Sequence, residues 1–166
     1  MIVTVTPNPS IDRTVTLAVP LTRGAVHRVG SVTSEPGGKG VNVARALTLA
    51  GLEAVAVLPA PGDDPMVAAL QSGAVPFTCV PSSGAVRTNL AITEHDGTTT
   101  KLNEPGAHLD AVALDALMRF MVASAESAAL VEVTVSSVLV ASSVLAGAAF
   151  FEALPLGMRL PLAALE

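Results

Sequence analysis

The sequence predicts an α/β fold in which a doubly wound parallel core carries a second, smaller sheet. Short β-branched runs such as MIVTVTP, residues 1–7, alternate with segments of helical spacing such as VNVARALTLAGL, residues 41–52. Other runs alternate apolar and polar residues, as strands do when one face only is covered. With 166 residues, the chain is long enough for one domain with a substantial core.

The first half of the chain supplies the strands and helices of a βαβ unit. MIVTVTP ends at a proline and is typical of a buried strand, and 13–19 and 25–36 alternate as half-covered strands. The helix at 41–52 has a glycine suited to its C-terminal cap. Residues 53–62, EAVAVLPAPG, then predict a second buried strand, and 64–73, DPMVAALQSG, a short helix.

The second half predicts more strands and one long helix. The runs at 75–82 and 86–103 are expected to be strands, and the Asp-Gly pair in the latter favours a tight hairpin turn. An amphipathic helix follows at 109–125. From 133 to 151 there is no charged residue, and we weigh a membrane span there against a buried strand. Its scattered serines and the lack of a flanking basic cluster favour the strand.

Composition excludes several classes of function. A net charge of −5, with four Phe and no Trp or Tyr, argues against nucleic acid as a partner, because basic surface and stacking rings are both scarce. The only cysteine, Cys79, cannot form an internal disulfide and is interpreted as a small core residue. The N-terminus has no export signal. We therefore expect a cytoplasmic protein without a membrane partner.

The segment SEPGGKGVNVARALTLAG, residues 34–51, is the first candidate site. Gly37, Gly38 and Gly40 surround Lys39 immediately before a helix, where unpaired N–H groups suit an anion or sugar oxygens. The pattern fits neither the Walker A motif nor the dinucleotide-binding motif. Asn42 can offer its amide to a sugar hydroxyl, and the alternative is that it caps the helix.

Three further charged residues complete the candidate site. Asp12 follows two prolines in TPNPSIDRT, and we expect a fixed loop to present its carboxylate to hydroxyl groups; the alternative is a turn aspartate bonded to its own backbone. The Asp-Gly turn could bring Arg87 and Lys101 together as a cationic pair that holds a phosphate. Taken singly, each cation would more often be a solvated charge.

These segments resemble a known family. VTPNPSIDRT, EPGGKGVNVARAL, RTNL and DGTTTKLNEPG together are similar to the phosphofructokinase B group of ribokinase-like sugar kinases, and most of all to the 1-phosphofructokinases, over about residues 1–123. The resemblance implies the N-terminal part of a ribokinase-like doubly wound α/β domain. A small β-sheet lid would be formed by strands within about 13–35 and 77–104. In relatives this lid often pairs with that of a second subunit, which makes a homodimer an expectation.

The resemblance also implies a reaction. ATP with Mg²⁺ would phosphorylate fructose 1-phosphate to fructose 1,6-bisphosphate. Asp12 would bind the sugar hydroxyls, and Arg87 would bind the substrate phosphate, helped by Lys101. The remaining residues of the sugar site would be Gly38, Lys39, Gly40 and Asn42. The related tagatose 6-phosphate kinases share this site, so the choice of sugar stays open.

The chain departs from the family after Ala123. Where relatives carry an SGSLPPG-like turn, this chain has ALVEVTVSSVLVASSVLAG, and no residue matches the aspartate of their GAGD segment, which is the catalytic base. We therefore expect 124–166 to be a divergent apolar tail of a truncated or frame-altered product, without catalytic residues, metal ligands or nucleotide site. Two hypotheses remain. The chain is the substrate-binding half of a sugar-phosphate kinase, or it is non-catalytic, either a sugar-phosphate-binding or dimerisation module or a decayed fragment without a function.

Overall fold

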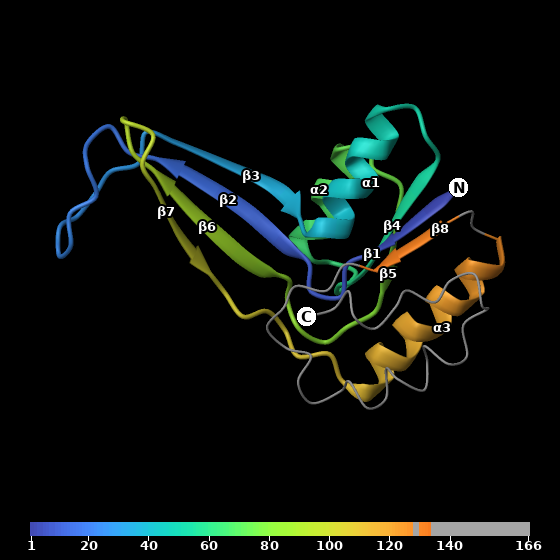
Figure 1. Cartoon of the computed structure of the whole chain (residues 1–166). Coiled ribbons are helices and arrows are strands. Elements are labelled where there is room, and N and C mark those ends of the chain that lie inside the picture. The colour runs from blue at the N-terminus through green and yellow to red at the C-terminus, as the bar shows by residue number, and fades with distance from the viewer. Residues whose placement is uncertain (128–129, 134–166) are drawn as a thin grey trace, which may run out of the picture. The chain divides into compact units, whose positions relative to one another are not determined.

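The computed structural model describes residues 1–127 and 130–133, which all lie in the first of two compact units, Met1–Val135 and Ser136–Glu166. This part of the chain contains two four-stranded sheets and three helices, whose arrangement can be followed in Figure 1. The first sheet is parallel throughout and has the strand order β5 (Phe77–Val80), β4 (Ala54–Pro59), β1 (Ile2–Val5), β8 (Leu130–Val133). The helices are α1 (Lys39–Leu49), α2 (Pro65–Ser72) and α3 (Ala111–Ser127).

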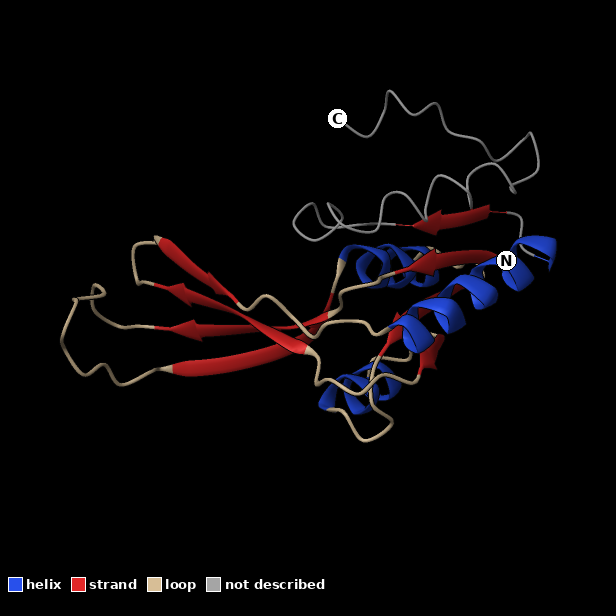
Figure 2. Cartoon of the chain, turned by 90° about the horizontal axis from the view of Figure 1, so that it is seen from below, coloured by secondary structure: helices blue, strands red, loops and turns tan. Residues whose placement is uncertain are grey.

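The second sheet is mixed. Its order is β3 (Ser31–Gly37), β2 (Ser10–Thr16), β6 (Arg87–Thr93), β7 (Thr99–Asn103). The two outer pairs are antiparallel, whereas β2 and β6 run parallel in the centre. In Figure 2 its four strands extend together away from the helices. The predicted α/β class with a second, separate sheet is confirmed, but that sheet is not the smaller one, since both have four strands in the part of the chain that the structure describes.

Helices cover both faces of the parallel sheet, which makes it doubly wound. On one face α1 and α2 share a core with β4, and its fully buried members include Val41, Met66 and Leu58. The alternate residues of the strands, such as Val5 and Val57, lie on the other face. The helix α3, in which Leu117 is buried, contacts β4, β5 and β8. The core is aliphatic, as the composition requires.

Two sequence predictions about strands need correction. The predicted lid range 77–104 includes β5, but β5 pairs in parallel with β4 in the first sheet. A short apolar run is compatible with either sheet, because periodicity does not specify the partner of a strand. The predicted strand at 25–36 begins only at Ser31, and residues 17–30 form an irregular connection.

The Asp-Gly turn is confirmed. Gly97 has a φ of 90° and its N–H donates to the carbonyl of Glu94, while the N–H of Thr98 donates to Oδ1 of Asp96. This hydrogen bond is the main cause that lowers the pKa of the exposed Asp96 carboxyl. The turn therefore fixes the antiparallel register of β6 and β7.

Regular structure continues past Ala123, since α3 ends at Ser127 and β8 pairs with β1. No helix of the described part has the length and apolar character that would let it cross a bilayer. The membrane span weighed for 133–151 falls, from residue 134 onward, outside the described residues, as does the rest of the predicted tail.

Candidate functional site

Asp12 lies within β2, not in a loop as the sequence predicts. The strand already begins at Ser10, because β3 and β6 pair with it on both sides from that residue. Oδ1 of Asp12 accepts hydrogen bonds from Ser10 Oγ (2.8 Å) and Asn89 Nδ2 (2.9 Å). Neither donor is the aspartate's own backbone, so the alternative of a self-bonded turn residue is wrong. The carboxylate is held by two side chains and is half-buried.

Gly37 provides the space in which this carboxylate lies. It is the last residue of β3 and pairs with Ser10. A Cβ on Gly37 would overlap both carboxylate oxygens of Asp12. Any larger residue would have to displace the aspartate or separate β3 from β2. The need for a glycine at position 37 is thus explained by the position of the Asp12 carboxylate.

The other two glycines allow α1 to approach β1. Gly38 has a φ of +113°, a region that side chains rarely adopt, and a Cβ on it would meet the methyl group of Thr6. A Cβ on Gly40 would meet Oγ1 of Thr6 and the carbonyl oxygen of Val5 at 2.6 and 2.9 Å. Both glycines therefore have a packing role. Their predicted place in a sugar site stays a prediction.

Two threonines fasten the first turn of α1 to the end of β1. Oγ1 of Thr6 accepts a hydrogen bond from the N–H of Val41 (3.0 Å), and Oγ1 of Thr4 donates one to the carbonyl of Gly40 (2.8 Å). All four residues are buried. Lys39, the first residue of the helix, is exposed, and its ammonium has no hydrogen-bond partner among the described residues. The fixed backbone therefore presents a free cation at this helix N-terminus.

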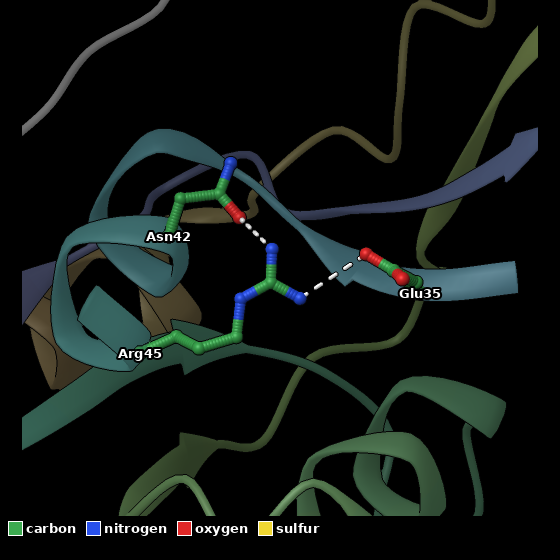
Figure 3. Close-up of polar contacts among 3 residues, drawn as sticks. All are labelled: Glu35, Asn42 and Arg45. Carbon is green, nitrogen blue, oxygen red and sulfur yellow. Dashed lines mark hydrogen bonds and ion pairs between the residues drawn. The ribbon is translucent and has the colours of Figure 1, made fainter. Parts of the chain in front are cut away.

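Asn42 is the fourth residue of α1 and does not cap it. The N-cap is Gly38, and the N–H of Asn42 donates to the Gly38 carbonyl (2.9 Å). Figure 3 shows Arg45 between Asn42 and Glu35: its Nη2 donates to Oδ1 of Asn42 (3.4 Å) and its Nη1 to Oε2 of Glu35 (3.2 Å). The contact leaves the NH₂ group of Asn42 available as a donor.

Arg87 begins β6 opposite Ser10. Its Nη1 donates to the carbonyl of Glu104 (3.1 Å), but its Nε is buried and has no partner within the ranges that the structure describes. Next to it, Gly106 has a φ of 90° and leaves room for Asn8 and for Cδ of Arg87. Asn8 and Arg87 also line a small pocket together with Pro7 and Pro9. Arg87 is therefore held in place while its buried Nε–H has no acceptor among the described residues.

The register separates Arg87 from Lys101. Lys101 is paired with Ala91, four residues beyond Arg87 along β6, which corresponds to about 13 Å along the strand. The exposed Lys101 side chain lies on the edge strand β7. The predicted cationic pair on one phosphate is thus wrong as a direct pair, although the hairpin that was expected to form it is present.

The register does bring Arg87 to the face of the sheet that carries Asp12. Asp12 pairs with Asn89 and bonds to it, and residues two apart on a strand point to the same face. Arg87, Asn89 and Asp12 therefore share one face, near the strand ends that meet α1. Asn89 and Ser10 were missed in the sequence, although the i, i+2 spacing in RTN could have drawn attention to Asn89.

The remaining polar chemistry in the described part is structural. Asp64 is buried and joins α2 to the segment before β6, because its carboxylate accepts from the N–H groups of Met66 and Val86, both at 2.9 Å. Burial, and secondly the charge of Asp64, raise the pKa of the half-buried Cys79 thiol. Across the described residues no group of His, Cys, Asp or Glu side chains is arranged to hold a metal ion.

Comparison with known proteins decides the family. The sequence profile described as "pfkB family carbohydrate kinase" matches residues 5–157. The chain belongs to this family. The match extends beyond Ala123, where the resemblance found in the sequence ends, and it confirms that resemblance.

Individual pfkB relatives agree with this assignment. A 1-phosphofructokinase of Xanthomonas campestris pv. campestris is 40% identical over 119 residues, which are 67% of this chain and 37% of that protein. Phosphofructokinase-2 from Escherichia coli in complex with fructose 6-phosphate is 30% identical, with a TM-score of 0.69 over 74% of this chain and 41% of the other. A possible 1-phosphofructokinase from Thermotoga maritima has a TM-score of 0.73 at 26% identity, covering 82% of this chain and 45% of that one. The chain thus spans about two-fifths of the length of these relatives.

Proposed function

We propose that this pfkB chain carries the sugar-phosphate-binding half of an ATP-dependent kinase for fructose 1-phosphate. The observation that supports this most is the shared face of Asp12 and Arg87. The Asp12 carboxylate and the Arg87 guanidinium, whose buried Nε–H has no partner among the described residues, lie on neighbouring strands there. Their chemistry fits a ligand with hydroxyl groups at one end and an anion at the other.

Each side chain has a role in this proposal. Oδ2 of Asp12, which accepts no hydrogen bond from the described residues, receives a sugar hydroxyl. Arg87 binds the substrate phosphate with charge-assisted hydrogen bonds. Lys39 and the NH₂ group of Asn42 approach the sugar from α1, beside Gly38 and Gly40. Lys101 is too far along β7 to share a phosphate with Arg87, so we place it at the periphery of the site.

ATP with Mg²⁺ would supply the phosphoryl group that the family transfers. We propose no residue of this chain for the nucleotide, the metal ion or the catalytic base, because none of its 166 residues matches the GAGD segment. In this proposal, the site residues assigned above bind and orient the acceptor sugar. We expect this to take place in the cytoplasm, where phosphorylated sugars are found.

Titration of the chain with fructose 1-phosphate tests the proposal. We expect millimolar affinity, which corresponds to about −4 kcal/mol, because ordering the second sheet around the ligand opposes the gain from its contacts. Arg87→Ala should weaken binding further, by about tenfold or more. Arg119→Ala is the matched control, since Arg119 is exposed on α3 and pairs with Asp115. Equal affinities of all three proteins would contradict the role of Arg87.

The second candidate function is dimerisation through the mixed sheet, β3-β2-β6-β7. The face opposite Asp12 carries apolar residues in register, with Val15 beside Val32 and Leu90 beside Leu102. Val32 and Leu102 are 43% and 56% exposed, which favours a covering partner, and a second copy would present the same face. Sedimentation of the wild type and of Leu102→Glu tests this, because the charge should abolish a dimer. A wild-type chain that sediments as a monomer would contradict it.

A further inference from the structure

The side-chain amide of Asn89 is not used by any role assigned above. It lies within β6, with its Nδ2 bonded to Oδ1 of Asp12 over 2.9 Å. Its Oδ1 is buried and receives no hydrogen bond from the residues that the structure describes. A buried acceptor without a donor is unusual in a folded protein, because its lost hydration is not compensated. The atom is therefore a place where a donor from outside the chain would fit.

The orientation of this amide is fixed by its neighbour. A carboxylate only accepts hydrogen bonds, so Asn89 has to turn its NH₂ group toward Asp12. Ser10 donates to the same oxygen of Asp12 from the other side. Consequently Oδ1 of Asn89 cannot exchange places with Nδ2 without facing the carboxylate, and it stays directed away from Asp12.

A second unpaired atom lies close by on the same face. Nε of Arg87 is also buried without a partner among the described residues, and Arg87 precedes Asn89 by two positions, or about 7 Å along the strand. Together with Oδ2 of Asp12, the sheet face thus presents two acceptors and then a cationic donor. A polyol that carries a phosphate presents hydroxyl donors and then an anion in the matching order.

We propose that Asn89 determines specificity in the sugar site in two ways. Its NH₂ group positions the Asp12 carboxylate, and its Oδ1 accepts a hydrogen bond from a hydroxyl of the ligand. Asp12 and Asn89 then distinguish a hydroxyl-bearing sugar phosphate from a simple anion, while Arg87 binds either one. The inference rests on the proposed function, since it assigns a further residue to the same site.

The test compares two probes, fructose 1-phosphate and inorganic phosphate, by amide chemical-shift titration of the whole chain. Asn89→Ala should lose about tenfold in affinity for fructose 1-phosphate, as expected for one or two lost hydrogen bonds, and keep its affinity for phosphate. Asn89→Asp should lose more, because it sets two carboxylates side by side on neighbouring strands. Arg87→Ala should lose affinity for both probes.

Asn103 offers the matched control. It pairs with Asn89 across β7, but it is exposed and forms no side-chain hydrogen bond with the described residues. Asn103→Ala and Asn103→Asp should therefore bind fructose 1-phosphate within about twofold of the wild type, as substitutions of exposed residues usually do. If Asn89→Ala does not fold, Asn89→Ser, which keeps a hydroxyl at the position, replaces it in the comparison.

The outcomes separate this inference from the proposed function. If the wild type binds no fructose 1-phosphate, the proposed function fails, and the inference fails with it. If the wild type binds but Asn89→Ala binds equally well, the inference alone is overturned. The inference is also overturned if Asn89→Ala loses affinity for both probes to the same extent, because the effect would then be a general distortion. It is overturned as well if Asn103→Asp loses as much affinity as Asn89→Asp, because the effect would then be a general charge effect.

Discussion

Replacing Thr6 by valine should destabilise the chain by leaving the Val41 N–H without an acceptor. The substitution keeps the shape of the side chain and removes only the oxygen to which Val41 donates. Val41 is fully buried and lies in the first turn of α1, where the helix itself offers its N–H no partner. An unsatisfied buried donor costs about 1–3 kcal/mol. For a chain of this length, this should lower the melting temperature by roughly 2–12 °C.

Thr4→Val is the control for this prediction. Thr4 is equally buried and loses the same hydroxyl, but there it is the donor, to the Gly40 carbonyl. That carbonyl keeps the hydrogen bond from the following turn of the helix, because a carbonyl oxygen can accept two. We therefore expect a cost below about 1 kcal/mol for Thr4→Val.

Urea unfolding and amide hydrogen exchange measure both variants. Thr6→Val should have the lower urea midpoint and faster exchange at Val41 than either the wild type or Thr4→Val. Lys39 begins the same turn of α1, so the affinity of the Thr6→Val variant for fructose 1-phosphate should fall as well. Equal midpoints for the two variants, with unchanged protection at Val41, would refute the reasoning that Thr6 fastens the helix N-terminus.

The other predictions concern the carboxylate, the thiol and catalysis. Gly37→Ala should reduce stability by about 1–3 kcal/mol and weaken binding of fructose 1-phosphate, because its Cβ overlaps the Asp12 carboxylate. Gly62→Ala, which has open space around it, should change neither. Equal stability and equal binding of the two variants in calorimetry would contradict this prediction. Iodoacetamide at pH 8 should alkylate Cys79 more slowly in the folded chain than in urea, because burial and the nearby Asp64 raise the pKa of the thiol; equal rates, followed by mass spectrometry, would exclude such protection. The 166-residue chain by itself should transfer no phosphoryl group from ATP to fructose 1-phosphate in a coupled assay; turnover of about 1–100 per second, as in ordinary kinases, would mean that it contains a catalytic base that its sequence motifs do not reveal.

The sequence predicts local elements well because their signals are local. The helix at 64–73 is found one residue from its observed start, since Asp64 and Pro65 are typical of a helix N-terminus. The turn at Asp96 and Gly97 is equally clear, because a positive φ is required there. Periodicity and cap residues carry this information within a few positions of the chain.

Pairing between distant segments could not be predicted in the same way. Alternation in β2 and β6 indicates strands but does not show that they lie side by side and parallel, with Asp12 opposite Asn89. The displacement of Lys101 from Arg87 follows from this register too. The candidate site was therefore predicted as a set of residue types, whereas the role of Asn89 and the separation of the two cations depended on knowing which strands are neighbours.

The central β2–β6 pair has a consequence for synthesis of the chain. Asp12 and Asn89 are 77 positions apart, and translation at about 5–20 residues per second adds such a length in roughly 4–15 s. During this interval β2 and β3 can form only a hairpin, and the edge of β2 that later binds β6 is open to other chains. A nascent polypeptide stalled before residue 87 should therefore bind a holdase chaperone, and release should coincide with the emergence of Arg87–Thr93 from the ribosome.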